Sequence, residues 1–344
     1  MKRLSVIIPG YNTTEKWWRR CVESVCAACG PEDEIICVDD GSQVKPTFLN
    51  EIARLDNRFR VLLLDVNGGP GCARNAALGI ANGRYVTFVD SDDAVYGDAL
   101  VRCVAKMAEC SCDVGCYGVK TVWDVDGMCK VDVLPEKSYG ELSPKDVLEI
   151  SRLNLFNYVW NKVYSQKFLR DNNIRFEPDV DVKKGDTPWV FGGEDNVFNL
   201  RCVMAGARWC SVADCGYIYY RPRTTLLSRY KPTAAKGARM VSNVWREYKE
   251  KTSNATAVLG DFGELSPSQE LWEEWRNIWM PGTPFGLIDR WRWLRLHPQV
   301  GGFVMFVKTA AFIWLRRHCY WRCVRRWNIR RSYPMAREWH GEIL

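Results

Sequence analysis

Uncharged apolar runs alternate with amphipathic stretches along the first 110 residues of the chain. Each run is bounded by Gly, Pro, Asp or Asn, as buried strands are, and the stretches between runs repeat apolar residues at helical spacing. The expected strands are Leu4–Pro9, Glu34–Asp40, Phe59–Leu64 and Tyr85–Val89, and the expected helices are Trp17–Cys29, Phe48–Leu55, Cys72–Ala81 and Gly97–Glu109. This alternation predicts an α/β fold with a parallel sheet and right-handed crossovers.

The pattern is less regular after residue 110. We expect a β-hairpin of Val114–Trp123 and Met128–Val133, helices at Ser143–Leu153, Gln166–Asn172 and Glu194–Ala205, strands at Val159–Tyr164 and Tyr217–Arg221, and an acidic loop from Phe176 to Gly193. Residues 231–285 are typical of a polar linker with one helix, Ser268–Met280.

Polar residues gather in the loops that follow the expected parallel strands. These loops are Tyr11-Asn12, Asp39 to Ser42, Gly68 to Arg74 and Asp90 to Asp93. Ligands of such sheets bind outside the carboxyl ends of the strands, so the four loops should converge on one crevice. No Gly-x-Gly-x-x-Gly follows a strand and no P-loop motif occurs, which argues against a dinucleotide fingerprint or a Walker-type site.

Asp90 and Asp92 follow the most apolar of the four runs. Side chains alternate along a strand, so the two carboxylates should point the same way at the carboxyl end of this strand. Neighbouring carboxylates repel one another, and Mg²⁺ or Mn²⁺ beside a phosphate is the cation that such oxygen ligands suit. The alternative is an acidic turn that caps the next helix.

The net charge of +7 comes from the C-terminal third. Residues 290–331 hold eleven Lys or Arg, no acidic residue and five interleaved Trp, around a 16-residue apolar centre at Val300–Leu315. That centre falls short of the roughly 20 residues that span a bilayer. A basic, Trp-bearing helix suits the surface of an anionic membrane. Two alternatives for this segment are a helical cap or dimer contact and a re-entrant or membrane-spanning segment. We expect no nucleic-acid binding.

The fifteen cysteines suggest a reducing compartment, because the only apolar run near the start, Leu4–Pro9, is too short for a secretory signal. Cys26-Ala-Ala-Cys29 has no second CxxC partner, so buried free thiols are expected in place of a zinc site.

Six motifs of the chain resemble those of family 2 glycosyltransferases in order and spacing, over about residues 3–230. They are Leu4-Ser-Val-Ile-Ile-Pro-Gly-Tyr-Asn12, Val38-Asp-Asp-Gly-Ser42, Ala73-Arg-Asn75, Asp90-Ser-Asp-Asp93, Asn161-Lys-Val-Tyr164 and Gly193-Glu-Asp-Asn-Val-Phe198. The resemblance implies a GT-A (Rossmann-like) fold, a mostly parallel sheet flanked by helices, and a reaction that inverts the anomeric centre.

The resemblance also implies roles for single residues. Tyr11 resembles the residue that stacks on the nucleotide base, and Asp40 resembles the carboxylate that hydrogen-bonds the base. Asp39 lies beside Asp40 and would support the loop. Arg74 resembles the basic residue near the base or diphosphate. Asp90 and Asp92 resemble the DxD pair on ribose and metal, and Asp195 the general base, with Glu194 as its neighbour. The motifs add Pro9, Asn12 and Ser91 to the nucleotide-sugar site. A packed aromatic at Tyr11 and a helix cap at Asp195 are the plain alternatives.

These expectations combine into one hypothesis. Residues 1–230 form the catalytic domain, with a nucleotide-binding half at 1–110 and an acceptor half at 111–230. A linker follows at 231–285, and a basic, Trp-rich helical extension at 286–344 binds an anionic membrane surface. The protein would use Mg²⁺ or Mn²⁺ to move a hexose from a nucleotide sugar, a UDP-sugar, to a glycan or lipid-linked glycan. It would do so in the cytoplasm, peripherally on the inner face of the cell membrane.

Single addition is favoured over processive synthesis, because Arg290-Trp-Arg-Trp293 lacks the Gln of the Q-x-x-R-W motif of processive synthases. Arg221, Arg223 or Arg229 could add positive charge near the diphosphate. Two other functions stay open: a metal-dependent nucleotidyltransferase, and a non-catalytic membrane-docked module that binds a nucleotide sugar.

Overall fold

The computed structural model describes residues 2–123, 129–153, 155–177, 193–221 and 234–260. The expected hairpin turn at Asp126-Gly127, most of the acidic loop before Gly193, the helix at Ser268–Met280 and the basic extension lie outside these ranges, as do Arg223 and Arg229. The elements are β1 (Lys2–Gly10), α1 (Glu15–Ala28), β2 (Glu34–Asp39), α2 (Phe48–Leu55), β3 (Phe59–Leu63), α3 (Pro70–Ile80), β4 (Gly83–Phe88), β5 (Ala94–Val95), α4 (Ala99–Cys110), β6 (Val114–Trp123), β7 (Cys129–Asp132), β8 (Lys137–Glu141), α5 (Pro144–Arg152), β9 (Lys162–Ser165), α6 (Gln166–Asp171), α7 (Glu194–Met204), β10 (Arg208–Arg221), α8 (Ala234–Lys251) and α9 (Ala255–Leu259).

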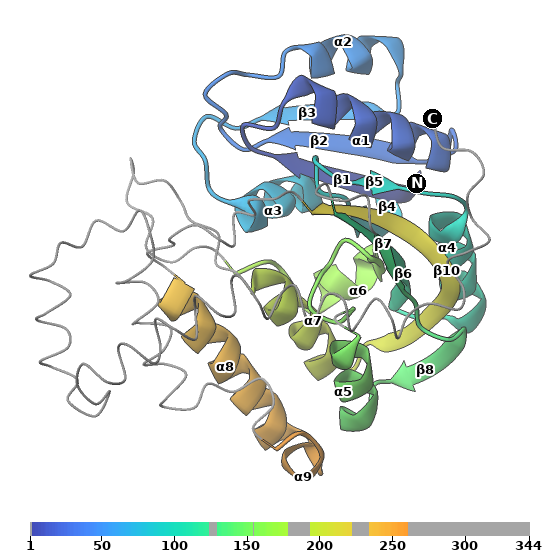
Figure 1. The fold of residues 1–344 in the computed structure, drawn as a ribbon, viewed down its shortest axis with the longest axis vertical. Coiled ribbons are helices and arrows are strands. Elements are labelled where there is room, and N and C mark those ends of the chain that lie inside the picture. The colour runs from blue at the N-terminus through green and yellow to red at the C-terminus, as the bar shows by residue number, and fades with distance from the viewer. Residues whose placement is uncertain (1, 124–128, 154, 178–192, 222–233, 261–344) are drawn as a thin grey trace, which may run out of the picture. The chain divides into compact units, whose positions relative to one another are not determined.

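The N-terminal half contains the expected parallel strands. Their order is β3-β2-β1-β4, and all three pairings are parallel. Every residue of β2 is buried, as is β1 from Leu4 to Gly10, which explains the apolar runs Val6–Ile8 and Ile35–Val38. After β3 the chain returns to the other side of β1, so the strand order reverses between β1 and β4 (Figure 1). The carboxyl ends of these two strands therefore border the ligand-binding crevice of such a sheet.

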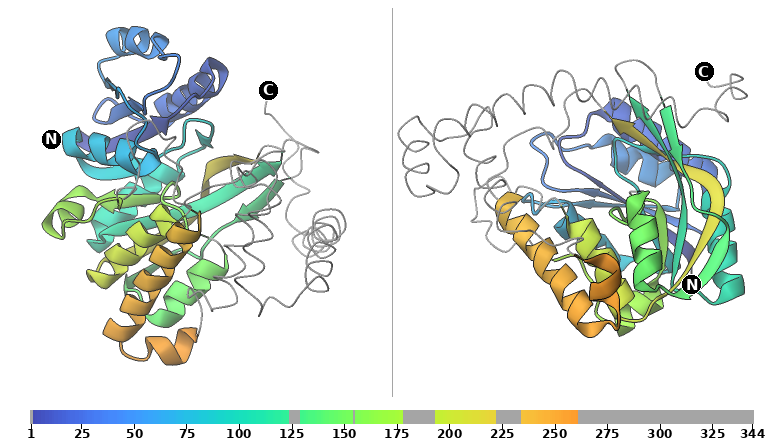
Figure 2. Two further views of the ribbon diagram at one scale, coloured as in Figure 1. Left: turned by 90° about the vertical axis from the view of Figure 1, so that its left-hand side faces the viewer. Right: turned by 60° about the horizontal axis from the view of Figure 1, so that its bottom comes forward.

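Beyond β4 the sheet is mixed, and the antiparallel pairing of β6 with β7 confirms the expected hairpin. Strand β9 runs antiparallel to both β4 and β6, and β5 and β8 are also antiparallel to their partners. Among the described strands beyond β4, only β6 and β10 pair in parallel, side by side over most of their length (Figure 2). The sequence pattern missed β5, β8 and the first half of β10, because these segments are short or mix apolar and polar residues.

The helices begin and end where local chemistry favours it. Trp18, Cys21, Val22 and Val25 form the buried stripe of α1 at helical spacing. Helix α3 begins with Pro70, whose fixed backbone suits the first turn. Ser143 caps α5 with a reciprocal capping box, as expected for this position.

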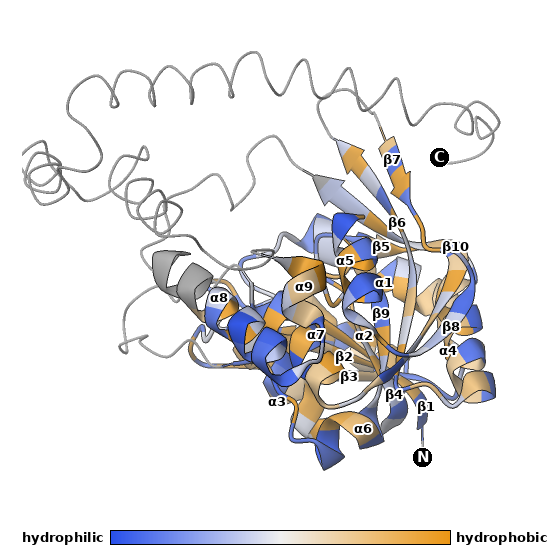
Figure 3. Cartoon of the chain, turned by 90° about the horizontal axis from the view of Figure 1, so that it is seen from below, coloured by the Kyte–Doolittle hydropathy of each residue, from blue (hydrophilic) through white to orange (hydrophobic). Residues whose placement is uncertain are grey.

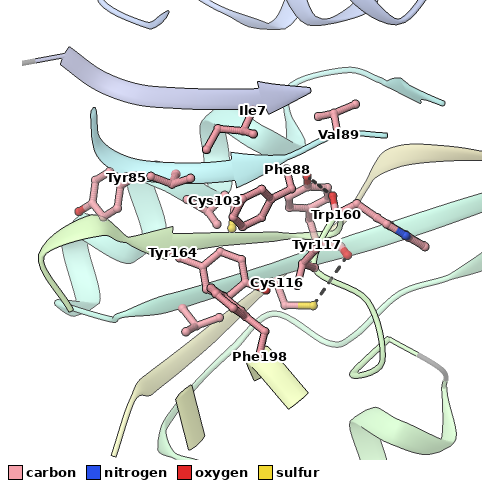
Figure 4. Packing of buried hydrophobic residues seen from close by; sticks show 14 of the residues in the cluster. Ile7, Tyr85, Phe88, Val89, Cys103, Cys116, Tyr117, Trp160, Tyr164 and Phe198 are labelled. Atoms are coloured by element: carbon pink, nitrogen blue, oxygen red, sulfur yellow. Dashed lines mark hydrogen bonds between the residues drawn. The ribbon is translucent and has the colours of Figure 1, made fainter. Parts of the chain in front are cut away.

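The hydrophobic core is continuous on both sides of the strand reversal. Figure 4 shows aromatic side chains of β4, β9 and α7 meeting in its centre. The ring centroids of Phe88 and Tyr164 are 5.9 Å apart, and those of Tyr164 and Phe198 5.3 Å apart at a right angle. Such edge-to-face pairs add attraction beyond burial of area. The core thus fixes the start of α7 relative to the end of β4.

Helix α8 lies in the segment expected to be a linker, which corrects that expectation. Val244, Trp245 and Tyr248 are buried at helical spacing, and the Trp245 indole N–H donates to Oδ1 of Asn196 in α7 at 3.0 Å. The visible side of α8 is largely hydrophilic (Figure 3). Because the outer side of α8 is polar, the average composition of this segment did not indicate its apolar stripe.

Among the described residues, no helix combines the length and apolar character that crossing a membrane requires. The thirteen cysteines in the described ranges are free thiols, as expected. Cys29 is a buried member of the CxxC, and burial raises the pKa of its thiol to about 12, so it stays protonated and unreactive.

Candidate functional site

A buried arginine joins the end of the parallel sheet to the start of α7. Arg74 of α3 donates from Nη2 to Oδ1 of Asp90 and from Nη1 to Oδ1 of Asp195, both at 2.8 Å. Its Nη1 also lies 3.8 Å from Oε1 of Glu194. The side chain of Arg74 is only 4% exposed, whereas that of Asp90 is 31% exposed. The structure therefore brings together four of the expected site residues from three separate segments.

Burial and charge act in opposite directions on this cluster. Burial alone would lower the pKa of Arg74, but the carboxylates of Asp195, Asp90 and Glu194 raise it, so the guanidinium stays charged. Burial raises the pKa of Asp195, and the positive charge of Arg74 opposes that change. Burial and the nearby Asp195 carboxylate raise the pKa of Glu194 to about 7, despite Arg74. Of the two neighbours, Asp195 has the closer contact with the arginine.

The start of α7 holds Asp195 in a defined orientation. Its Oδ1 accepts from Arg74, and its Oδ2 accepts from the backbone N–H of Val159 at 3.3 Å. Asp195 lies in the first turn of the helix, where the macrodipole favours a carboxylate. Each carboxylate oxygen has two lone pairs, so both can still accept a hydrogen bond from a ligand hydroxyl.

The turn after β4 differs from the expected geometry. Strand β4 ends at Phe88, and Asp90 to Asp93 form a turn closed by a backbone hydrogen bond from Asp93 to Asp90 of 3.0 Å. Strand alternation therefore does not orient Asp90 and Asp92, and that argument was wrong. The two carboxylates are still close enough to interact. Although Asp92 is exposed at the surface, the protein around its carboxylate and the nearby charge of Asp90 together raise its pKa to about 6.

Asp93 points into the protein. Tyr217 of β10 donates its hydroxyl to Oδ2 of Asp93 at 2.8 Å, and the same hydroxyl accepts the backbone N–H of Asp90 at 3.1 Å. The backbone N–H of Tyr220 donates to the other carboxylate oxygen of Asp93. Burial raises the pKa of Asp93 well above its usual range. This residue anchors the turn to β10, while Asp90 contacts Arg74 and Asp92 is exposed.

The donor set at this turn fits a hard divalent cation. The described residues contain no group of three or more His, Cys, Asp or Glu arranged to hold a metal ion. Asp90 and Asp92 provide two carboxylates whose repulsion a cation would relieve. Mg²⁺ is commonly held by one or two carboxylates together with water and substrate phosphates. The pair is thus suited to a metal that arrives with a diphosphate.

The loops after β1 and β2 are tied together. The backbone N–H of Asn12 donates to Oγ of Ser42 at 2.8 Å, and the N–H of Gln43 donates to Oδ1 of Asn12 at 3.0 Å. Gly41 has a φ of +71°, and a Cβ there would lie 2.4 Å from the backbone nitrogen of Asn67. Only glycine allows this close approach. Tyr11 is 38% exposed beside these loops, so it is not a fully packed core aromatic.

Asp39 and Asp40 are both buried, with different partners. Oδ1 of Asp40 accepts from the backbone N–H of Gly68 at 2.9 Å, which ties the β2 loop to the loop before α3. Oδ2 of Asp39 accepts from Ser42 and Lys45, but its Oδ1 is buried without a hydrogen-bond partner in the described part of the chain. Asp39 thus supports the loop, as expected, and Asp40 also holds it through Gly68.

The remaining predicted residues lie deeper. Pro9 is buried in β1 opposite Val38 of β2. Oγ of Ser91 is buried and lies 2.8 Å from Oγ1 of Thr13, linking the β4 turn to the β1 loop. Pro9 and Ser91 are therefore buried residues that support the loops of the site.

Two residues near the site were not predicted from the sequence. Arg20 of α1 donates from Nη2 to the backbone carbonyl of Asp92, and its guanidinium carbon lies 3.9 Å from the ring centroid of Trp17 and 3.4 Å from that of Tyr220. Lys162 of β9 is completely buried. The available signals were a Trp one helical turn before Arg20 and the motif Asn161-Lys-Val-Tyr164, which contains Lys162.

Comparisons with known proteins agree with this geometry. Residues 5–136 match the family model described as Glycosyl transferase family 2. The chain is 28% identical over 225 residues to the succinoglycan biosynthesis protein ExoO of Rhizobium meliloti, covering 63% of this chain and 60% of that protein. It is 30% identical over 221 residues to a poly(ribitol-phosphate) beta-glucosyltransferase of Bacillus spizizenii, covering 63% of this chain and 32% of that protein. The chain thus spans less than two thirds of these relatives.

The fold also matches solved structures. The crystal structure of residues 1–349 of Staphylococcus aureus TarS in complex with UDP-GlcNAc superimposes with a TM-score of 0.60 at 21% identity, covering 80% of each chain. The identity is low, so this likeness concerns the fold. Residues 5–136 thus form a domain that matches the family 2 glycosyltransferases at the sequence level, and the fold is of GT-A type.

Proposed function

We propose that this protein transfers a hexose-type sugar from a UDP-sugar to a hydroxyl group of a cell-surface glycan, with inversion at the anomeric carbon. The observation that carries the proposal is the contact of Arg74 with both Asp90 and Asp195. It joins a carboxylate turn suited to a metal-bound diphosphate to a buried carboxylate suited to act as a base.

Asp195 is the proposed general base. It takes the proton of the acceptor hydroxyl while the acceptor oxygen bonds to the anomeric carbon. The bond from that carbon to the phosphate oxygen breaks on the opposite face, and the nucleoside diphosphate leaves with the electron pair. Arg74 and the Val159 N–H hold Asp195 in place and favour its ionised form. Glu194 is the less suitable of the two neighbours, because its Oε1 lies 3.8 Å from Nη1 of Arg74 and lacks the hydrogen bond that orients Asp195.

Asp92 and Asp90 would hold Mg²⁺ or Mn²⁺ at the diphosphate. When bound, the metal neutralises negative charge that develops on the leaving group. Arg74 and Arg20 supply fixed positive charge on either side of the carboxylate turn through their contacts with Asp90 and Asp92.

The nucleotide base would stack on Tyr11, whose ring is partly exposed next to the joined β1 and β2 loops. Asp40 is the proposed acceptor for a base N–H, since each of its carboxylate oxygens can accept more than the one bond from Gly68. The unsatisfied Oδ1 of Asp39 is a second candidate acceptor beside it. The TarS complexes with UDP and UDP-GlcNAc support a uridine nucleotide for this chain.

The acceptor class is supported by the relatives. Their names describe succinoglycan biosynthesis and transfer to poly(ribitol phosphate), both of which point to cell-surface polymers. A lipid-linked acceptor would fit the basic, Trp-rich residues 286–344, for which we propose peripheral binding to the inner face of the membrane.

A panel of nucleotides tests the donor. The melting temperature of the full chain is measured with UDP, GDP, CMP, dTDP or ATP, each with and without Mn²⁺, since a ligand that binds only the folded state stabilises it. A metal-dependent rise with UDP alone supports the proposal. A rise with ATP, or CMP, in place of UDP would favour a nucleotidyltransferase. If no nucleotide raises the melting temperature, the protein does not bind these nucleotides, and a non-catalytic module is favoured.

Product stereochemistry tests the mechanism. With an α-linked UDP-sugar and octyl β-D-glucoside as a probe acceptor, the proton NMR coupling of the new linkage should be that of a β-glycoside. An α-linked product would contradict a single inverting displacement at this site.

A further inference from the structure

Lys162 is a buried amine that the proposed mechanism does not use. It opens β9, and its side chain has no exposed surface. Its Nζ donates to the backbone carbonyl of Leu155 at 2.5 Å, to the carbonyl of Tyr158 and to Oδ1 of Asn161 at 2.8 Å. An ammonium group has three N–H donors, so the three acceptors match its protonated form completely. An uncharged amine has only two donors and would leave one acceptor without a partner.

The three acceptors belong to a single loop, residues 155–161. The loop leads from α5 into β9 and is also held from α7, because Nδ2 of Asn199 donates to the carbonyls of Phe156 and Tyr158. Asn199 is itself fixed by the hydroxyl of Tyr164, which donates to Oδ1 at 2.7 Å. Lys162 and Asn199 thus hold the loop through different carbonyl groups and share only that of Tyr158.

The middle of this loop contacts the proposed base. Val159 follows directly after Tyr158, and its backbone N–H donates to Oδ2 of Asp195. The loop carbonyls that Lys162 and Asn199 hold therefore determine where this N–H points. A change of shape at Tyr158 would remove one of the two protein groups that orient Asp195.

We propose that Lys162 is a positioning residue for the base. Its ammonium holds the loop of residues 155–161 so that the Val159 N–H meets Asp195, and its positive charge helps to keep the Asp195 carboxylate ionised. The inference rests on the proposed function and extends it to a residue that contacts neither donor nor acceptor.

The charges around both groups agree with this arrangement. Burial lowers the pKa of Lys162 to about 8, while Cys116 of β6, with Asp195 and Cys202 of α7, favour its charged form. In turn, Lys162 and Arg74 both lower the pKa of Asp195. Asp90 and Glu194 are the negative groups that face Asp195, so Lys162 and Arg74 are the cations that offset them.

The test compares Lys162→Gln with Asn199→Ala in the full chain. Both changes loosen the same loop, but only the first removes a charge. The rate of UDP release is followed from pH 5 to 10 with the UDP-sugar selected by the nucleotide panel and octyl β-D-glucoside as acceptor. The melting temperature with UDP and Mn²⁺ confirms folding and donor binding for each variant.

Lys162→Gln should lower kcat at least tenfold, as loss of correct orientation does, while the KM of the donor stays within about twofold. The acid limb of its pH profile should move to higher pH, because the base has lost a nearby cation. Asn199→Ala should lower kcat and move that limb less than Lys162→Gln does, because it loosens the Val159 N–H but keeps the charge of Lys162. The wild-type protein should lose activity above about pH 8, where Lys162 loses its proton, and Lys162→Gln should lack this alkaline limb.

Two results would overturn the inference: an acid limb in Lys162→Gln that coincides with the wild-type limb, or wild-type activity that stays level to pH 10. The second measurement needs no variant, so it decides the question even if Lys162→Gln does not fold. Asp195→Asn is assayed in parallel. If that variant keeps full activity, the proposed base is wrong; if it is inactive while the Lys162→Gln profile is unshifted, only the inference about Lys162 fails.

Discussion

Arg74 and Asp195 lie 121 positions apart in the chain, yet Nη1 of the first is 2.8 Å from Oδ1 of the second. The contact connects α3, which follows the parallel strands, with α7, which begins in the second half of the domain. The aromatic rings of Phe176 and Phe88 lie 5.2 and 6.0 Å from the guanidinium carbon of Arg74, so the ion pair sits against apolar surface. In such surroundings an unpaired charge is costly.

Removal of Arg74 should therefore destabilise the protein strongly. Arg74→Met leaves the carboxylates of Asp90, Glu194 and Asp195 without their shared cation, and breaking a buried pair in this way costs about 3–5 kcal/mol. Urea unfolding measures the change in the free energy of unfolding. Arg19→Met is the matched control, because Arg19 pairs with Glu15 at the surface and should cost no more than about 1 kcal/mol.

The cost of Arg74→Met should depend on pH. The folded-state pKa of Glu194 is raised to about 7, above its usual value of 4.5. A raised carboxyl pKa contributes stability at low pH that is lost as pH rises through the folded value. Without Arg74 this loss grows, so the variant should be less impaired at pH 5 than at pH 8. An equal cost at both pH values would show that the carboxylates are not the cause.

Substitution of the proposed base should abolish transfer while leaving donor binding intact. Asp195→Asn keeps the shape of the side chain but cannot accept the acceptor proton, and loss of a general base slows a reaction by roughly 100-fold or more. Isothermal titration with UDP and Mn²⁺ should give an affinity within about twofold of wild type, because UDP does not need the base. Glu194→Gln is the control and should keep most of the activity. The reverse pattern would assign the base to Glu194.

Metal-dependent binding of UDP should depend on Asp92 and on pH. Asp92→Asn should remove the effect of Mn²⁺ on UDP affinity, whereas Asp98→Asn, a change at an exposed carboxylate nearby, should not. The pKa of Asp92 is raised to about 6, and a metal competes with its proton. The affinity for Mn²⁺ should therefore fall roughly tenfold per pH unit below pH 6, since one proton is displaced. Affinity that is constant from pH 7 to 5 would remove Asp92 as a ligand.

Loss of the Tyr217 hydroxyl should destabilise the carboxylate turn. Tyr217→Phe deprives Asp93 of a donor and the Asp90 N–H of an acceptor, and a buried unsatisfied polar group costs about 1–3 kcal/mol. The variant should also bind Mn²⁺ and UDP more weakly. Tyr96→Phe makes the same chemical change at a partly exposed position and should stay within about 0.5 kcal/mol of wild type. Equal stability of the two variants would contradict the anchoring role of Tyr217.

The basic extension should attach the protein to anionic membranes. Deletion of the residues after Pro284 should abolish sedimentation with vesicles that contain phosphatidylglycerol, and salt should weaken the binding of the full chain. Vesicles of phosphatidylcholine alone are the control. If the shortened protein still sediments with anionic vesicles, the membrane contact lies elsewhere.

The parallel strands could be predicted from the sequence because strands buried on both faces need continuous apolar runs, as in Ile35–Val38. Helix α8 could not be identified in this way, since its apolar stripe, which includes Val244 and Trp245, is interrupted by charged residues of the solvent side. A search for helical periodicity in place of average polarity would have found it.

The motif residues could be named from the sequence, but their contacts could not. Nothing in the local pattern indicates that Arg74 bonds to both Asp90 and Asp195, because that depends on how α3 and α7 pack across the sheet. The contacts of Asp39 and Asp40 are a similar case: their sequence position does not show that Asp40 also holds the loop through Gly68. Asp93 was part of the expected acidic turn, and only its bond to Tyr217 shows that it faces inward.

The hydrogen bonds of Tyr217 also set an order of events during synthesis. Strands β1 to β4 have emerged from the ribosome more than a hundred residues before β10, yet the turn after β4 obtains its contacts with β10 only when Tyr217 and Tyr220 arrive. Until then Asp93 lacks the hydrogen bonds that hold it inward, and the turn is held by its contacts with the N-terminal half alone. A nascent chain that stops before residue 217 should therefore possess the parallel half of the sheet but no affinity for a metal-bound nucleotide. That affinity should appear abruptly once β10 has paired with β6.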